Sequence, residues 1–133
     1  MKRSTRATVI GVAAVGIVTA IVFRQPLGPV DKIRVDAGLD RLQANSILRQ
    51  VAVETLGSDD EVIDGENPTQ RARRLGYDGV AGCSLAWGHG NWAGAVDALM
   101  LTPNSQNILG DYDDIGMAHD GDAFVIIFGR RTE

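Results

Sequence analysis

The chain has 133 residues, a length that suits a single domain. Its hydrophobic fraction of 44% and charged fraction of 23% are those of a packed globular protein, which excludes intrinsic disorder. Four of the 13 basic residues lie within residues 1–24 and all 17 acidic residues lie after them, so the body carries a net charge of about −8. This charge excludes binding of the body to nucleic acid or to an anionic membrane surface, because both need a basic face.

The N-terminal segment has the pattern of an export signal. Three basic residues precede an uncharged apolar run over residues 7–23, as in signal peptides. The triplet Val-Thr-Ala at 18–20 is a candidate cleavage site, although three more apolar residues follow it. We expect residues 1–24 to form either a cleaved signal peptide or an uncleaved membrane anchor with the body outside. A short stiff linker over residues 25–29 follows.

The first helix predicted in the body covers residues 30–37, with a proline before it and a glycine after it. A second helix over residues 47–56 has Asn45 or Ser46 as its N-cap and ends at Gly57. Its apolar side chains share one face, as expected of a helix that packs on a core: Ile47, Leu48, Val51, Ala52 and Leu56.

Residues 58–66 are polar and acidic, which predicts a loop. Asn67 caps a third helix that begins at Pro68 and stops before Gly76. This helix carries three arginines near its C-terminal end: Arg71, Arg73 and Arg74. We expect these side chains to be solvated and to complement the negative end of the helix, rather than to bind a ligand.

A strand is predicted over residues 83–87, which are short and apolar between glycines. A fourth helix covers residues 92–101, after an asparagine cap and before a proline. Two strands over residues 115–118 and 124–128 flank a turn over residues 119–122. Helices mixed with a few strands predict an α+β fold in which helices pack on a small antiparallel sheet.

Six segments follow, in order and spacing, the motifs of one protein family. The family's Asn-x-x-Arg, Asp-Gly, Arg-Ala-x-x-x-Gly-Tyr, Gly-Glu-Asn-Ile-Ala-x-Gly, Trp-Met and Ser-Pro-x-His passages correspond to residues 31–34, 64–65, 71–77, 82–88, 95–100 and 102–105. The chain thus resembles the CAP superfamily, the module of cysteine-rich secretory proteins, antigen 5 and pathogenesis-related-1 proteins, and its bacterial branch in particular. The resemblance covers about residues 30–129.

The resemblance implies that residues 30–133 form one CAP-like domain, an α-β-α sandwich with a central cleft. It also implies a protein that is secreted or anchored to the outer face of the cytoplasmic membrane. In the family, the cleft gathers two histidines and acidic residues, in some members around a divalent metal. Lipids, sterols and proteins are ligands associated with the family.

This chain departs from the family at each of those cleft positions. Ser105 stands where the histidine of Ser-Pro-x-His falls, and Cys83 stands where the glutamate of Gly-Glu-Asn falls. The region of the other histidine, residues 58–64, contains none. A hydroxyl is a poor metal ligand beside imidazole and carboxylate. We therefore predict no metal and no cofactor.

A substitute site has few candidates. Cys83 and His89 supply a nucleophile and a base, and with the acidic loop at residues 59–61 they could bind a metal. A separation of six residues along a strand spans roughly 20 Å, so the loop would have to fold back. We expect instead a buried, unreactive thiol and an exposed loop histidine. An intermolecular disulfide through Cys83 stays open.

The other candidate residues are expected to be structural. His119 is predicted in the turn between the last two strands. The residues Asp111, Asp113 and Asp114 lack the ligand spacing and the turn glycine of a calcium loop, so we expect a solvated acidic turn. Trp87 and Trp92 are expected in the core or in a cleft wall.

The sequence therefore predicts an exported, non-catalytic CAP-like protein that binds an unidentified lipid or protein partner at the cell envelope. The predicted ligand-binding cleft contains Cys83, Trp87, His89 and Ser105. One alternative is a divergent hydrolase or metal-dependent enzyme that uses Cys83 and His89. Another is a module that spaces or docks partners from the membrane, which it would contact only through an uncleaved segment over residues 7–23.

Overall fold

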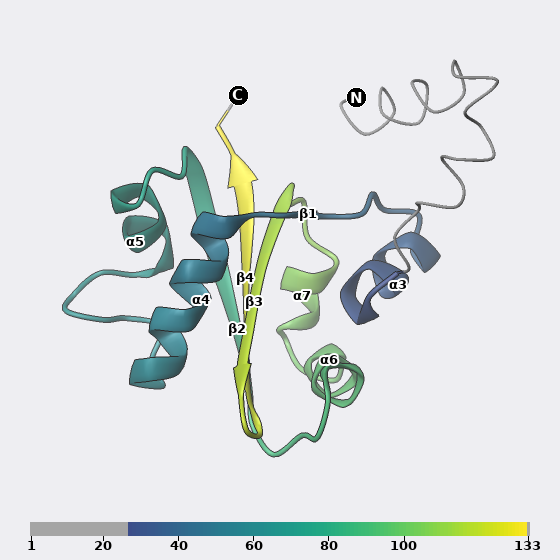
Figure 1. Ribbon diagram of the computed structural model, residues 1–133. Helices are drawn as coiled ribbons and strands as arrows, with labels where there is room; N and C mark the ends of the chain where they lie inside the picture. The colour runs from purple at the N-terminus through teal and green to yellow at the C-terminus, as the bar shows by residue number, and fades with distance from the viewer. Residues whose placement is uncertain (1–26, 133) are drawn as a thin grey trace, which may run out of the picture.

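The computed structural model describes residues 27–132, so the export segment predicted over residues 1–24 lies outside it. A four-stranded sheet in the order β1-β3-β4-β2 forms the middle layer (Figure 1). The strands are β1 (Gln43–Ala44), β2 (Gly79–Ala86), β3 (Asp114–Asp120) and β4 (Ala123–Arg131). β4 pairs antiparallel with β2 and with β3. The two-residue strand β1, which the sequence does not predict, pairs with β3 in parallel and makes the sheet mixed.

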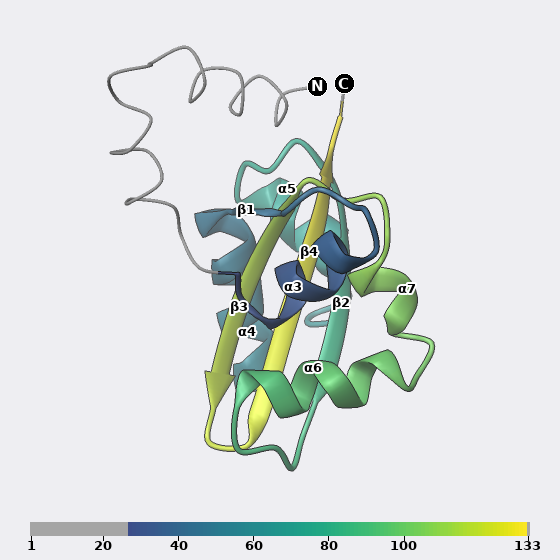
Figure 2. The ribbon, with the colours of Figure 1, turned by 90° about the vertical axis from the view of Figure 1, so that its right-hand side faces the viewer.

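Helices cover both faces of this sheet. They are α3 (Pro29–Asp36), α4 (Ser46–Ser58), α5 (Pro68–Arg74), α6 (Trp92–Met100) and α7 (Ser105–Ile108). α4 and α5 lie on one face, whereas α3, α6 and α7 lie on the other (Figure 1, Figure 2). This arrangement confirms the predicted α+β fold and its α-β-α layers. The short helix α7 has no counterpart among the predicted elements.

The two faces of β4 supply the centres of two hydrophobic clusters. Phe124, Ile126 and Phe128 belong to the cluster beneath α3, α6 and α7. Val125 and Ile127 belong to the cluster beneath α4 and α5. Alternate residues of a strand point to opposite faces, so a strand buried on both sides is apolar at successive positions. This is the reason that residues 124–128 show no polar alternation in the sequence.

The ends of α4 show where capping decides a helix boundary. Asn45 begins α4 by accepting a hydrogen bond from the backbone amide three residues later, at 3.0 Å. The predicted end at Gly57 is wrong, because α4 continues through this glycine for one more residue. Asp59 ends the helix in the left-handed region, with a φ of 56°, and its amide donates to the Thr55 carbonyl at 2.8 Å. A glycine inside a helix costs only about 1 kcal/mol, so the buried face of α4 overrides it.

Two strands differ in extent from their predictions. β2 begins at Gly79, four residues earlier than expected, and ends before Trp87. The sequence places His119 in a turn, but this residue lies in β3, opposite Phe124 of β4. The turn itself is limited to residues 121–122, and its glycine has a φ of 58°. Because the turn is shorter than predicted, the pairing of β3 with β4 continues through His119 and Asp120, beyond the apolar residues on which the strand prediction was based.

Two charged side chains that were expected to be solvated are buried. Arg71 of α5 donates from Nη2 to the Thr55 hydroxyl at 2.8 Å and to the Glu61 carbonyl at 2.9 Å. Asp114 of β3 forms an ion pair with Arg131 of β4 at 2.7 Å. The prediction that these two side chains are solvated is wrong, because each one binds partners that are distant in the sequence. These bonds join α5 to α4 and its following loop, and join the ends of β3 and β4.

Candidate functional site

Cys83 lies in the middle of β2, opposite Ile127, and packs against the cluster beneath α4 and α5. The pKa of its thiol is raised to about 12, mainly by burial and to a smaller extent by the carboxylate of Glu61, against a lowering by the guanidinium of Arg71. A thiol with this pKa carries its proton near neutrality. Because the thiolate is the nucleophilic form, Cys83 has the wrong protonation state for covalent catalysis.

Cys83 is therefore expected to react with iodoacetamide at pH 8 at least about 100-fold more slowly in the folded protein than in urea. Its pKa rises from 9.0 to about 12 on folding, so the folded state holds the proton more tightly. The resulting stability is present below pH 9 and is lost as the pH rises toward 12. Mass spectrometry of the alkylated chain measures both rates, and equal rates would contradict the burial of the thiol.

His89 lies in the loop between β2 and α6, on the other side of the sheet from Cys83. Its Nδ1 is 3.9 Å from the point where a Cβ on Gly94 of α6 would stand. α6 covers the face opposite to the cluster that contains the Cys83 side chain. The structure thus separates the two residues that the alternative enzymatic hypothesis needs together.

A neutral hydrogen-bond network occupies the region next to Ser105, which is the first residue of α7. The buried hydroxyl of Ser84 in β2 donates to Oδ1 of Asn104 at 3.0 Å. The amide of Asn107 donates to the Ser84 hydroxyl at 3.0 Å, and Tyr112 donates to Oδ1 of Asn107 at 3.4 Å. Amides and aliphatic hydroxyls do not titrate near neutrality, so Ser84, Asn104 and Asn107 hold α7 against β2 and are not a general acid or base.

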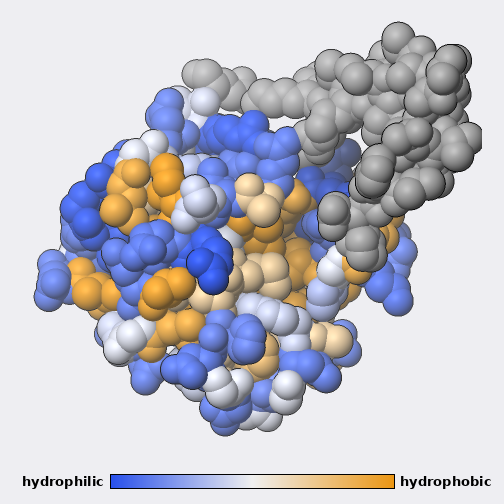
Figure 3. All heavy atoms as spheres, in the orientation of Figure 1, coloured by the Kyte–Doolittle hydropathy of each residue, from blue (hydrophilic) through white to orange (hydrophobic). Residues whose placement is uncertain are grey.

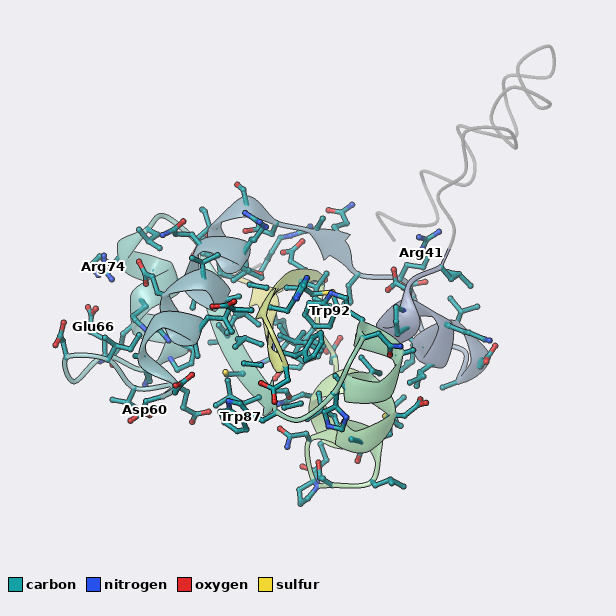
Figure 4. All side chains as sticks on the ribbon, turned by 60° about the horizontal axis from the view of Figure 1, so that its bottom comes forward. Arg41, Asp60, Glu66, Arg74, Trp87 and Trp92 are labelled. Carbon is teal, nitrogen blue, oxygen red and sulfur yellow. The ribbon has the colours of Figure 1, made fainter. Side chains whose placement is uncertain are left out.

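The two tryptophans have different surroundings (Figure 4). Trp87 follows the end of β2 and is 51% exposed. Trp92, at the start of α6, makes edge-to-face contacts with Phe124 and His119, with ring centroids 4.8 and 5.7 Å apart. The imidazole of His119 is stacked on Phe124. The aromatic group around Trp92 thus forms a rigid wall, whereas Trp87 presents an apolar surface to solvent.

An open groove of about 690 Å³ lies between α4 and this aromatic wall. Its floor is residues 117–120 of β3, and Val53 and Leu56 of α4 form one wall. Trp92 and Pro29 form the opposite wall. Apolar residues line a hollow in this part of the surface, and polar residues surround it (Figure 3). We call this feature the β3 groove.

Sequence reasoning missed the β3 groove, although one signal for it was present. Arg49, Val53, Leu56 and Gly57 line the groove and recur at helical spacing along α4, beside the face that is fully buried. Val53 in this stripe is 40% exposed. The groove also needs β3 and Trp92, which are distant in the sequence, so this stripe alone did not predict it.

Residues 27–132 contain neither a cluster of metal ligands nor a helix that could span a membrane. Within this range, no three histidine, cysteine or acidic side chains are grouped so that they could hold a metal ion. No helix in the same range is long and apolar enough to cross a membrane.

Comparison with solved structures finds three bacterial proteins of the same architecture. An outer surface protein of Borrelia burgdorferi matches with a TM-score of 0.69 and 25% identity, over 77% of this chain and 87% of that one. An extracellular protein of Bacillus anthracis that contains an SCP domain matches with a TM-score of 0.65 and 16% identity, over 81% of this chain. A cysteine-rich secretory protein of Staphylococcus aureus matches with a TM-score of 0.64 and 18% identity, over 77% of this chain.

The chain has the SCP/CAP fold. This agrees with the resemblance read from the sequence motifs. The match covers 45% of the Bacillus protein and 36% of the Staphylococcus protein, so both neighbours are considerably longer than this chain. No protein-family model and no curated protein sequence matches it significantly.

Proposed function

We propose that this protein is an exported SCP/CAP-fold binding module without hydrolytic activity, which holds an apolar lipid or protein ligand in the β3 groove at the cell envelope. The β3 groove carries the proposal. Its volume of about 690 Å³ lies within the range of small-ligand sites. Its lining joins apolar side chains to Arg49, His119 and Asp120 and includes no serine, threonine or cysteine that could act as a nucleophile.

Two observations support export. Residues 7–23 form an apolar run behind three basic residues, the pattern of a signal peptide or anchor. The structural neighbours include an outer surface protein and an extracellular protein. We propose that the folded body lies outside the cytoplasmic membrane, either released after cleavage or held by residues 1–24.

One residue of the ligand-binding cleft predicted from the sequence, Trp87, also enters this proposal. Trp87 is the member of that cleft with a large exposed apolar surface, so we propose it as a second contact for the partner. The alternative of a hydrolase needs a thiolate at Cys83 and a base within reach. The raised pKa of the Cys83 thiol and the location of His89 beside α6 favour the binding module.

The experiment uses a chain of residues 25–133 and the fluorescent dye anilinonaphthalene sulfonate as an apolar, anionic probe. Val53→Glu places a carboxylate on the groove wall and is expected to weaken dye binding by at least about tenfold, because a charge must then lose its hydration in an apolar contact. Val62→Glu is the matched control, since Val62 is similarly exposed, at 46% against 40% for Val53, but lies outside the groove lining. Equal loss of binding in both variants, or in neither, would contradict the proposal.

A further inference from the structure

The floor of the β3 groove is an edge of the sheet that has free backbone groups. β1 pairs only with Asp114 and Ile115, at the upper end of β3 in Figure 1, and the chain then turns into α4. The Asn45 amide donates to the Ile115 carbonyl at 2.9 Å on this edge. Backbone groups two residues apart face the same way, so the N–H and C=O groups of Met117 and His119 also face it. No hydrogen bond from another described residue reaches these groups.

These two free residues, Met117 and His119, distinguish between classes of ligand. An acyl chain on the groove floor would remove water from their N–H and C=O groups and would offer no hydrogen bond in return. Leaving backbone groups buried and unpaired is unfavourable. An extended peptide carries N–H and C=O groups at the spacing of the strand beside it and can pair with all of them. The floor therefore favours a peptide over a lipid.

The position of Asn45 sets the direction of such a peptide. Ala44 lies opposite Ile115, so Asn45 occupies the next position along β3. A parallel strand bonds each of the two free residues from the positions on either side of it, and Asn45 already holds the first of those positions. In an antiparallel pair, the residues directly opposite exchange both bonds. The free edge therefore favours an antiparallel segment.

The walls and ends of the groove specify the side chains of the segment. Successive side chains of a strand face opposite walls, so one set meets the aliphatic wall of α4 and the other meets Trp92 and Pro29. Arg49 is exposed on α4 beside Gly116, where the free edge begins, and Asp120 is exposed at its other end. A lipid holds its charge in one headgroup. An apolar peptide with a basic residue at one end and an acidic residue at the other complements both charges.

A second copy of the chain does not fit this site. It would present its own β3 from the bottom of an identical groove. α4 stands on one side of that groove, and Trp92 with Pro29 stands on the other, so the walls would keep the two edges apart. A single extended segment is narrow enough to reach the floor and pair with the edge.

We infer that the β3 groove binds an extended segment of a partner protein, which pairs antiparallel with Met117 and His119 and adds a strand to the sheet. The inference rests on the proposed function and names its ligand as a peptide rather than a lipid. The segment is apolar in its middle, with a basic residue toward Asp120 and an acidic residue toward Arg49. The free edge opposite residues 117–120 holds about four residues, which span roughly 13 Å.

Amide hydrogen exchange of residues 25–133 with a synthetic peptide tests the inference. The probe is acetyl-Lys-Phe-Val-Phe-Glu-amide, in which the lysine lies opposite Asp120 and the two phenylalanines lie opposite the two free residues. At millimolar peptide, the amides of Met117 and His119 are expected to exchange at least about tenfold more slowly. The amide of Ile127, in the central strand, is expected to exchange at the same rate with and without the peptide.

Two methylated peptides provide the matched controls, and the protein stays unmodified in both. N-methylation of the two phenylalanines removes the N–H groups that face β3, so the protection is expected to disappear. N-methylation of the valine and the glutamate alters N–H groups that face away from β3, and the protection is expected to persist. Equal protection by the two methylated peptides, or no protection by the unmethylated one, would overturn the inference.

Other occupants give other results. Oleate that slows the exchange of Met117 and His119 when the peptide does not would identify an acyl chain as the ligand. Protection that increases with protein concentration alone would identify a second copy. Either result would overturn the inference.

These outcomes are separable from those of the proposed function. Dye binding that depends on Val53, together with no protection by the peptide, refutes the inference and leaves the proposed function intact. Protection by the peptide in a protein whose dye binding is indifferent to Val53→Glu has the opposite meaning. If both proposals hold, Val53→Glu weakens the dye and the peptide together.

Discussion

Replacing Gly116 by alanine is expected to lower the free energy of unfolding by about 3 kcal/mol, or to prevent folding. Gly116 lies in β3 where α4 crosses the sheet, and a Cβ at this position would overlap the backbone atoms of Leu48 and Arg49. Backbone atoms of a packed helix cannot rotate away as a flexible side chain can. Relief would require α4 to move off the sheet, which would open the cluster between α4 and β4.

Gly57→Ala is the matched control in urea denaturation. Gly57 lies inside α4, and no atom lies within 4 Å of its added Cβ. Alanine is the better helix former, so this variant is expected to gain up to about 1 kcal/mol. Opposite signs for the two glycine substitutions are the expected pattern. A Gly116→Ala protein as stable as the unmodified one would mean that α4 does not lie as close to β3 as the structure places it.

Arg131→Met is expected to lower the free energy of unfolding by about 3 kcal/mol, because it leaves a buried carboxylate without its counter-charge. Asp114 is only 2% exposed. Arg131 donates to its two oxygens at 2.7 and 2.8 Å, and the Tyr77 hydroxyl donates to one of them at 2.8 Å. The ion pair also raises the pKa of Arg131, so this guanidinium stays charged at every accessible pH.

Arg74→Met provides the comparison for a surface charge. Arg74 is half exposed and pairs with Glu66 at 3.1 Å. Exposed pairs of this kind contribute little, so we expect a change within about 0.5 kcal/mol. Denaturation of both variants measures the difference. Similar losses at positions 74 and 131 would show that the Asp114 site is hydrated rather than buried.

Local signals in the sequence predicted the helices well. Asn67 and Asn91 are the predicted caps, and Asn45 is one of the two candidates for the cap of α4, because a cap acts on an amide only three residues away. Gly57 was wrongly predicted to end α4. A glycine permits a helix to end but does not require it, and the packing of the buried face of α4 keeps this residue helical. β1 was missed because two residues leave no periodic pattern.

The burial of charges and the site itself depend on contacts that are distant in the sequence. Arg71 and Asp114 were expected in solvent, since nothing near them in sequence indicates their buried partners. Cys83 and His89 were considered together because they are close in sequence. In the structure Cys83 faces the helices α4 and α5, whereas His89 lies beside α6 on the other face. The sequence of one strand does not tell which helices cover which of its faces. The β3 groove was missed for the same reason, because its lining comes from four elements that are distant in the sequence: α3, α4, α6 and β3.

We propose that this chain, which has the SCP/CAP fold, binds no metal ion where the family that it resembles gathers histidines and acidic residues. Native mass spectrometry of residues 25–133 with one equivalent of zinc tests it most directly. We predict the mass of the metal-free chain, with no stoichiometric adduct. A single bound zinc that disappears in Cys83→Ala or His89→Ala would contradict the claim and restore the metal-dependent enzyme as the better hypothesis.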